Sequence, residues 1–402
     1  MNETDKKDIV ILALARWDGP ISGTAFCLAE GLSKTNRVFY IDNPFTISDV
    51  IRGWGTEQIR KRIISLFFGM GPCRRFQDNE NLFYVTSPLV IPINFLPKGR
   101  IYNFFSGINN FGISRTLKKV CKEKNIRDFV FLNSLNPFYF SNIQKFKPAC
   151  TVYYNGDYMS ESKYVSKHGV ELEKKLIRQF TFTISTSRFL QKYSALFTSE
   201  SHYLPNAADF YLFRSALSLT PDNRPDELKN VKSKIVGYIG HVEDRIDFDL
   251  LLDVINLNPD KCFLFIGPIG SDQFRNMGFE LLPNVVALGS KNIKELPNYL
   301  RFIDCAIIPY KKNKLTEGIY PLKINEYLAA GRPVVCTSFS QDILEFNDVI
   351  QLADSAAEFS KAIQAEIDSD NPEKIQNRLN KATVNTWESR ATEFKRLISK
   401  YS

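Results

Sequence analysis

The sequence is short of the residues that build disulfide frameworks and metal centres. Its 402 residues include seven cysteines, an odd number, and three histidines. None of them stands at the spacing of a CxxC pair or of a metal-ligating cluster, so we expect neither a disulfide framework nor a zinc site. A GxGxxG dinucleotide fingerprint is also missing after the first strand-like segment, and the sequence has no internal repeat or low-complexity tract.

Long apolar runs and a hydrophobic leader are missing too. No run approaches the roughly 18 to 20 apolar residues of a membrane span, and the N-terminal sequence MNETDKKD is polar. These features predict a cytoplasmic protein. The net charge of +8 suits anionic small molecules, anionic lipid or nucleic acid and does not choose among them. Because no recognition motif or concentrated basic domain is present, we expect no nucleic-acid partner.

Alternating strand-like and helix-like segments fill most of the chain. The apolar run DIVILAL at 8–14, an amphipathic segment at 24–33 and a strand-like segment at 37–41 form a βαβ opening. A chain of 402 residues suits two domains of about 200 residues each. The pattern predicts an α/β protein with two Rossmann-like, doubly wound domains. Further strands are predicted at 82–85, 128–132, 151–154, 182–185, 234–239, 262–266, 285–288, 305–308 and 334–336.

A stretch rich in Pro, Asp, Asn and Lys interrupts this alternation between residues 205 and 234. Such composition favours a crossing between domains. We place an N-terminal domain at 1–212 and a C-terminal domain at 213–384. The tail over 385–402 is predicted to form a closing helix.

The most specific pattern in the chain is YPLKINEYLAAGRPVVCT, residues 320–337. Pro321 suits the first turn of a helix, because its φ is fixed and its missing N–H is not needed there. Gly331 can end the helix in the left-handed conformation, and Pro333 prevents continuation. A buried strand then begins at Val334. The pattern predicts a short helix between a loop and a strand.

Lys323 and Glu326 are three residues apart and share one face of this helix near its N-terminus. A lysine in the first turn opposes the helix dipole by roughly 0.3 to 1 kcal/mol. A bound phosphate would offset that cost, because helix N-termini present free N–H groups to anions. Glu326, one turn deeper, can accept two hydrogen bonds from a ribose diol. The alternative interpretation is a solvated ion pair between the two side chains.

This segment resembles the donor-site signature of GT-B glycosyltransferases, in particular glycosyltransferase family 4 and the bacterial teichuronic-acid and xanthan-type polysaccharide enzymes. In that family the lysine of Pro-Leu-Lys contacts the donor diphosphate, and the acidic residue three positions later binds the nucleotide ribose. Those roles fall on Lys323 and Glu326, with Tyr320, Pro321 and Leu322 in the same donor site.

The resemblance implies two domains that face a cleft and a metal-independent hexosyl transfer. The donor would be a nucleotide-diphosphate sugar, UDP by preference, and the acceptor a polysaccharide or a lipid-linked saccharide. The nucleotide sugar is then a substrate, so no cofactor is expected. The tail over 385–402 resembles the family's C-terminal segment, which crosses back onto the first domain. The chain departs from the family pattern at one position. The family has a second glutamate where this chain has Gly318, and the nearest glutamate here, Glu317, lies one residue earlier.

The loop after the strand at 234–239 is a second candidate for the donor site. In open α/β sheets, ligands bind outside the carboxyl ends of strands. Gly240 opens a tight turn whose amides can approach a diphosphate, and His241 and Arg245 lie in the same loop. Many retaining GT-B enzymes have an arginine near this loop and a lysine five residues later, but this chain has Leu250 there. We interpret Arg245 as a helper of the donor lysine, and the alternative is a purely structural turn.

Acidic and aromatic residues in the N-terminal half are candidates for the acceptor side. Asp157 follows the strand at 151–154 and is expected to face the interdomain cleft. In some inverting relatives an acidic residue at this place is the base, so we predict Asp157 as the catalytic base, against the alternative of an Asx turn. Arg16, Trp17 and Asp18 lie in the first βα loop and are predicted on the acceptor side.

The segment 51–76 mixes six arginine and lysine residues with aromatic and aliphatic side chains. This mixture is typical of a surface that lies on an anionic membrane, and it predicts peripheral association with the inner face of the plasma membrane. The alternative is a core helix with a basic, solvated face.

Two other functions are compatible with the same fold. A nucleotide-sugar 2-epimerase would need a richer set of acid and base residues than three scattered histidines supply. A non-catalytic GT-B subunit that binds sugar nucleotide is favoured by the displaced Glu317 and by the missing lysine at position 250.

Overall fold

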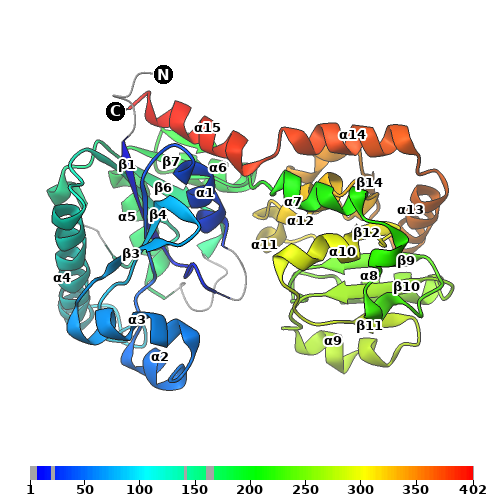
Figure 1. Ribbon diagram of the computed structural model, residues 1–402, viewed down its shortest axis with the longest axis horizontal. Helices are drawn as coiled ribbons and strands as arrows, with labels where there is room; N and C mark the ends of the chain where they lie inside the picture. The colour runs from blue at the N-terminus through cyan, green and yellow to red at the C-terminus, as the bar shows by residue number, and fades with distance from the viewer. Residues whose placement is uncertain (1–6, 20–22, 140–142, 160–166, 402) are drawn as a thin grey trace. The chain divides into compact units, whose positions relative to one another are not determined.

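The computed structural model, which describes residues 7–19, 23–139, 143–159 and 167–401, divides into two units (Figure 1). Unit 1 comprises Met1–Pro205 together with Arg390–Ser402, and unit 2 comprises Asn206–Ser389. Each unit is built around its own parallel sheet. The predicted α/β fold with two Rossmann-like domains is therefore confirmed.

The sheet of unit 1 has eight strands in the order β3-β4-β2-β1-β5-β6-β7-β8. All neighbouring pairs are parallel except β3 and β4, which pair antiparallel. The four strands β1, β2, β5 and β6 are buried along their whole length, which explains their continuous apolar runs. The bounds are β1 Asp8–Ala13, β2 Val38–Ile41, β3 Cys73–Phe76, β4 Asn79–Val85, β5 Phe129–Ser134, β6 Cys150–Asn155, β7 Phe182–Ser185 and β8 Ser201–Tyr203.

The helices of unit 1 connect these strands and cover the sheet (Figure 1). Thr46 begins α2 with a capping box that it forms with Asp49, and Gly69 ends α3 at a φ of 60°. The bounds are α1 Thr24–Ser33, α2 Ile47–Arg52, α3 Glu57–Phe68, α4 Arg100–Glu123, α5 Gly169–Gln179, α6 Arg188–Ala195 and α15 Trp387–Ile398.

The sheet of unit 2 has six parallel strands in the order β11-β10-β9-β12-β13-β14. Numbered from the first strand of the unit, this reads 3-2-1-4-5-6, the order of the Rossmann fold. The direction of winding changes between β9 and β12, and ligands of such sheets bind at that point, beyond the carboxyl ends. The bounds are β9 Ile235–Ile239, β10 Cys262–Ile266, β11 Val285–Ala287, β12 Cys305–Ile308, β13 Val334–Cys336 and β14 Gln351–Leu352.

The predicted helix after Pro321 is α12, which begins at Leu322 with Pro321 as its N-cap. Gly331 adopts a φ of 70° just beyond its end, the left-handed conformation that the sequence predicts. The other helices of unit 2 are α7 Phe210–Arg214, α8 Phe248–Leu257, α9 Asp272–Asn276, α10 Leu296–Leu300, α11 Lys314–Glu317, α12 Leu322–Ala329, α13 Ala356–Asp368 and α14 Pro372–Thr383.

The two boundaries between the units lie next to α7 and within α15. Phe210 and Phe213 of α7 lie in the core of unit 2, so the division falls between Pro205 and Asn206. In α15, Phe394 is fully buried, and the segment from Arg390 onward belongs to unit 1.

Candidate functional site

Three glycines end consecutive strands at the carboxyl edge of the unit 2 sheet. Gly240 follows β9, Gly267 follows β10 and Gly289 lies beyond β11, with φ values of 137°, 143° and 68°. L-residues with a side chain rarely adopt these values, which glycine adopts freely. The backbones also approach closely, because a Cβ on Gly267 would lie 2.1 Å from the carbonyl oxygen of Gly240. The edge is therefore lined by bare backbone at the point where the strand order reverses.

Lys323 lies directly over the first of these turns. A Cβ on Gly240 would be 2.3 Å from Cε of Lys323 and 2.5 Å from its Nζ. Helix α12 is held against the end of β9 by Tyr327, whose hydroxyl accepts a hydrogen bond of 2.8 Å from the backbone N–H of Ile239. The structure thus brings together the two segments that the sequence singled out separately.

Two tyrosines surround the ammonium group of Lys323. Its Nζ donates a hydrogen bond of 3.0 Å to the hydroxyl of Tyr310 and lies 5.1 Å from the ring centroid of Tyr238. Burial raises the pKa of the Tyr310 phenol, but the positive charges of Lys323 and Arg245 outweigh burial, and the pKa is lowered overall. The surroundings of the Tyr310 hydroxyl are therefore electropositive and suit an anion.

Arg245 extends this positive region along the same loop, which also carries His241. Glu243 holds both, with 3.5 Å to Nδ1 of His241 and 2.5 Å to Nε of Arg245. The guanidinium of Arg245 also lies 6.0 Å from the centroid of Tyr310. A Cβ on Gly270 would lie 2.3 Å from Nε2 of His241, so this turn too leaves room only for backbone.

Glu326 is a half-buried carboxyl group one helical turn from Lys323. Burial raises its pKa to about 7, although the charge of Lys323 acts in the opposite direction. Its carboxylate accepts no hydrogen bond from any residue that the structure describes. A desolvated acceptor without a protein donor is suited to a ligand that brings its own donors.

The remaining donor-site candidates support α12. Tyr320 is buried, its backbone oxygen accepts a hydrogen bond of 3.0 Å from Nδ2 of Asn206, and its hydroxyl lies 3.4 Å from Oδ1 of Asn325. Pro321 is buried as the N-cap and Leu322 is half-buried. These three residues fix where the helix begins.

Tyr238, Tyr310, Gly267 and Gly270 belong to this site but were missed from the sequence. Tyr310 lies two residues beyond β12, and the two glycines follow β10 in the sequence GPIG. A search for residues just beyond each strand of the predicted parallel sheet would have found Tyr310 and the two glycines, but not Tyr238, which lies within β9.

Asp157 lies just beyond the carboxyl end of β6 and its side chain is exposed. The neighbouring turn is held by Thr186, whose Oγ1 donates a hydrogen bond of 3.2 Å to the carbonyl of Gly156. The base role of Asp157 stays a prediction.

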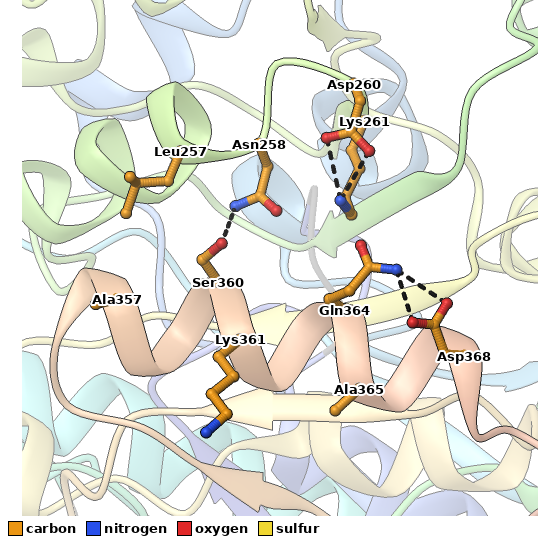
Figure 2. A pocket seen from close by; sticks show the side chains of 10 residues that line it. All are labelled: Leu257, Asn258, Asp260, Lys261, Ala357, Ser360, Lys361, Gln364, Ala365 and Asp368. Carbon is orange, nitrogen blue, oxygen red and sulfur yellow. Dashed lines mark hydrogen bonds and ion pairs between the residues drawn. The ribbon is translucent and has the colours of Figure 1, made fainter.

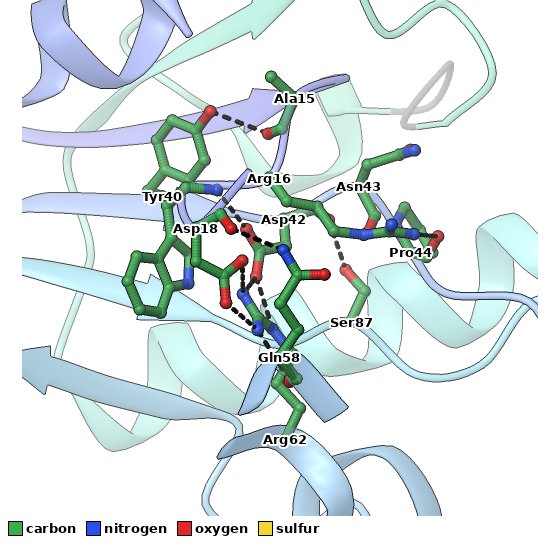
Figure 3. A network of polar contacts seen from close by, with 11 residues as sticks. Ala15, Arg16, Asp18, Tyr40, Asp42, Asn43, Pro44, Gln58, Arg62 and Ser87 are labelled. Atoms are coloured by element: carbon green, nitrogen blue, oxygen red, sulfur yellow. Dashed lines mark hydrogen bonds and ion pairs between the residues drawn. The ribbon is translucent and has the colours of Figure 1, made fainter. Parts of the chain in front are cut away.

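Arg16 and Asp18 are part of a network of polar contacts that holds the first βα loop of unit 1 (Figure 3), and the backbone of Trp17 joins the same network. Nε of Arg16 donates to the carbonyl of Asn43 at 3.2 Å, and the backbone N–H of Trp17 donates to Asp42 at 3.2 Å. The structure thus places all three residues in structural contacts, and their predicted acceptor role stays a prediction.

The centre of this network is Arg62 of α3, which is wholly buried. Its guanidinium forms ion pairs of 2.7 Å with both Asp18 and Asp42 (Figure 3). Burial raises the pKa of Asp42 to about 6, against the opposing charge of Arg62. The expectation that the basic residues of 51–76 together face a membrane is therefore wrong for Arg62, because a charge paired on both sides is unavailable to lipid.

A pocket of about 680 Å³ lies elsewhere in unit 2, between the end of α8 and α13 (Figure 2). Its polar groups satisfy one another, as in the 2.8 Å hydrogen bond from Nδ2 of Asn258 to Oγ of Ser360. Lys261 lines it and directly precedes β10, so the pocket opens at the amino edge of the sheet, opposite Gly240. It is not part of the candidate site.

Across the described ranges, no three His, Cys, Asp or Glu side chains are grouped as a metal ion would require. Within the same part of the chain, no helix combines the length and apolarity of a membrane span.

Two Rossmann-like units, with a lysine-bearing helix over the glycine turn of the second, have the architecture of the GT-B fold. Residues 233–368, all within unit 2, match the family described as Glycosyl transferases group 1. The predicted resemblance to GT-B glycosyltransferases is confirmed.

The chain is 34% identical over 140 residues to a Bacillus subtilis (strain 168) protein named as a teichuronic acid biosynthesis glycosyltransferase, TuaH. The match covers 34% of this chain and 34% of TuaH, about a third of each.

Solved GT-B structures match over nearly the whole chain. Anabaena HepE in complex with UDP and glucose has a TM-score of 0.65 at 13% identity, covering 98% of this chain and 99% of HepE. The UDP-forming α,α-trehalose-phosphate synthase from Burkholderia vietnamiensis has a TM-score of 0.69 at 13% identity, covering 98% of this chain and 99% of that enzyme. At such identity these likenesses establish the fold.

Proposed function

We propose that the protein is a glycosyltransferase that moves a sugar from a nucleotide-diphosphate sugar, by preference a UDP-sugar, to a polysaccharide or lipid-linked acceptor. The observation that carries the proposal is Lys323, held by Tyr310 over the bare backbone of Gly240. The group 1 match over 233–368, the relative TuaH and the UDP complex of HepE support it.

In this proposal unit 2 binds the donor. Lys323 and the free N–H groups of the first turn of α12 contact the diphosphate, with Arg245 adding positive charge and His241 beside it in the same loop. Glu326 accepts hydrogen bonds from the two ribose hydroxyls. As the bond to the sugar breaks, negative charge grows on the departing diphosphate, and these fixed donors stabilise it in place of a divalent metal.

Unit 1 supplies the acceptor side. Asp157 removes the proton of the acceptor hydroxyl, since its carboxylate is exposed at the carboxyl edge of the sheet. Asp157→Asn keeps the shape but not the proton acceptor. We expect this variant to bind donor normally and to turn over far more slowly, and wild-type turnover would move the base to another residue.

We also propose a cytoplasmic enzyme that works at the inner face of the plasma membrane. This placement is supported by a donor that is a cytosolic metabolite and by an acceptor class that includes lipid-linked saccharides.

Thermal unfolding with UDP, GDP, ADP, CMP and TDP tests the donor site. A nucleotide at a hundred times its dissociation constant stabilises the native state by about 2.7 kcal/mol. We expect UDP to raise the unfolding temperature most and to do so equally with EDTA present. No shift with any nucleotide would contradict the proposal, and a shift that EDTA abolishes would contradict metal independence.

Incubation with radiolabelled UDP-sugars and membrane or saccharide extracts then separates the rival functions. A glycosyltransferase moves the label to the acceptor. Conversion of the free donor to its 2-epimer would instead identify an epimerase. Tight nucleotide binding with neither reaction, over all UDP-sugars and extracts, would identify a non-catalytic subunit.

A further inference from the structure

Exposed apolar side chains are concentrated in one part of unit 1. Of the 21 large apolar residues that are exposed in the described chain, 13 lie within residues 47–111. Scattered exposed apolar residues are ordinary, but a concentration of this kind marks an interaction surface.

Four of the 13 form a line along α4, which we name the α4 stripe. They are Ile101, Phe104, Ile108 and Phe111, with exposed fractions of 62%, 66%, 44% and 69%. Their spacing of three and four residues puts them on one face of the helix.

The stripe is not the side of α4 that packs on the sheet. The buried side chains of the helix are Tyr102, Asn109, Ile113, Leu117 and Val120. At 100° per residue this set points about 150° away from the α4 stripe. The helix therefore has two apolar faces, and the core of unit 1 accounts for one of them.

Beyond Phe111, the face of α4 that carries the stripe becomes positively charged. The next residues at the same spacing are Arg115, Lys118 and Lys122, all exposed, and among the described residues none of them forms an ion pair. Between Glu80 and Glu123 the sequence holds six lysines and arginines and no aspartate or glutamate. One helix face is thus apolar in its first half and cationic in its second.

Helices α2 and α3, which lie near one end of α4 (Figure 1), carry further exposed apolar side chains. Exposed Ile47, Ile51 and Trp54 lie on or just after α2, which follows the carboxyl end of β2. Phe67 and Phe68 are exposed at the end of α3, and Lys119 of α4 donates a hydrogen bond of 2.9 Å to the carbonyl of Gly69 beside them.

We propose that the α4 stripe and its basic continuation form a docking surface for an anionic lipid bilayer. Phe and Ile side chains on one face enter the acyl boundary, and the cationic residues on the same face meet the headgroups. The stretch from 81 to 122, which carries the α4 stripe and its basic continuation, contributes no carboxylate that would repel anionic lipid.

A second copy of the chain fits this face less well. If two α4 helices paired in parallel, Arg115, Lys118 and Lys122 would face the same three cations. If they paired antiparallel, these cations would meet the aromatic half of the stripe and lose hydration. Anionic lipid satisfies both halves at once.

This surface deepens the proposed function, because it would hold unit 1 where a lipid-linked acceptor is presented. Vesicle binding is nevertheless measured without nucleotide, and nucleotide binding is measured without vesicles. A failure of the lipid-docking proposal therefore appears only in vesicle binding, and a failure of the proposed donor site appears only in nucleotide binding.

Sedimentation with vesicles of phosphatidylglycerol and phosphatidylcholine tests the apolar half. We expect the wild type to sediment at low salt, and Phe104→Ser with Phe111→Ser to lower its partition coefficient at least tenfold. The matched control combines Leu196→Ser with Leu281→Ser, which are 75% and 87% exposed but lie outside the surface. The control should sediment as the wild type does.

A second triple variant tests the basic half. Replacing Arg115, Lys118 and Lys122 with glutamine should lower binding to anionic vesicles on the order of 100-fold and leave the weak binding to neutral vesicles unchanged. Added salt should have the same effect on the wild type. The control replaces three exposed lysines of unit 2, Lys232, Lys294 and Lys361.

Three results would overturn the proposal. The wild type could fail to bind anionic vesicles at low salt, or the control sets could lose binding as strongly as the stripe variants. Sedimentation equilibrium without lipid could also show a dimer that the Phe104 and Phe111 substitutions dissociate, which would assign the face to a second copy.

Discussion

The ammonium group of Lys323 is stabilised by two phenol rings and by no carboxylate in hydrogen-bonding contact among the described residues. Such a group keeps most of its charge available to a ligand. We expect Lys323→Ala to weaken UDP binding roughly 10- to 100-fold, since one charged hydrogen bond is worth about 1.5 to 3 kcal/mol. Titration calorimetry measures the change. Lys314→Ala removes an exposed lysine from α11 and is the matched control; equal affinities in both variants would reduce Lys323 to a surface charge.

Glu326 predicts a pH dependence of stability. Its pKa is about 7 in the folded protein against a usual value of 4.5, so the native state holds a proton that the unfolded chain has released between these values. Its stabilising contribution is present below about pH 4.5 and is lost as pH rises through about 7.

Urea unfolding of wild type and Glu326→Gln from pH 4.5 to 8 measures this contribution. We expect the variant to gain on the order of 1 to 3 kcal/mol relative to wild type over that range. Glu317→Gln, which changes an exposed glutamate, is measured in parallel as the control. A pH-independent difference between Glu326→Gln and the wild type would contradict the raised pKa of Glu326.

The spacing of Lys323 and Glu326 was enough to predict that they share a helix face, because the distance between them is set within one helical turn. Tyr238 and Tyr310 could not be predicted in this way. They reach Lys323 because β9 and β12 are neighbours in the sheet, and that adjacency follows from strand order and not from any local pattern.

In helix α3, the sequence pattern does not predict which basic side chains are buried. Its arginine and lysine residues look alike in the sequence, but Arg62 is buried between Asp18 and Asp42 while Arg60 is exposed. Helical periodicity gives the faces of α3 but not which face meets the acidic residues of the first two βα loops.

Arg62→Met should therefore destabilise unit 1 by roughly 3 to 5 kcal/mol, because two buried carboxylates lose their partner. Arg60→Met, on the exposed face, should change stability by less than about 0.5 kcal/mol. Chemical denaturation compares the two variants, and similar small losses would mean that the carboxylates find other partners.

The strands show the opposite case, since most of them were predicted to within two residues. β1, β7, β10, β12 and β13 are fully buried, and their apolar runs are continuous. β3 was missed because Cys73–Phe76 contains two adjacent arginines and is only partly buried at the sheet edge. Pairing along such an edge depends on the hydrogen bonds to β4 more than on side-chain pattern.

At the scale of the whole molecule, unit 1 is assembled from two distant parts of the chain. Tyr401 stacks on Phe182 at 4.8 Å, and its hydroxyl lies 2.8 Å from Nε2 of His202. Lys395 donates a hydrogen bond of 3.0 Å to Oγ1 of Thr35. The segment from Arg390 onward is thus a structural part of the first unit.

Phe394→Ala should lower the stability of unit 1 by about 3 to 5 kcal/mol, because a fully buried ring is removed. Unit 2 should still bind UDP with wild-type affinity. Scanning calorimetry with and without nucleotide resolves the two effects, and Phe95→Ala, 73% exposed, is the control. Loss of nucleotide binding in Phe394→Ala would mean that the two units do not unfold independently.

The return of α15 to unit 1 also sets an order of events during translation. Unit 2 is one uninterrupted segment, Asn206–Ser389, so all of it is synthesised before Phe394 is. The earlier part of unit 1 is synthesised first, but the surface that α15 covers stays exposed throughout that interval. A chain that ends at Ser389 and has been released from the ribosome should therefore carry a protease-resistant second unit and a first unit that proteases still cut.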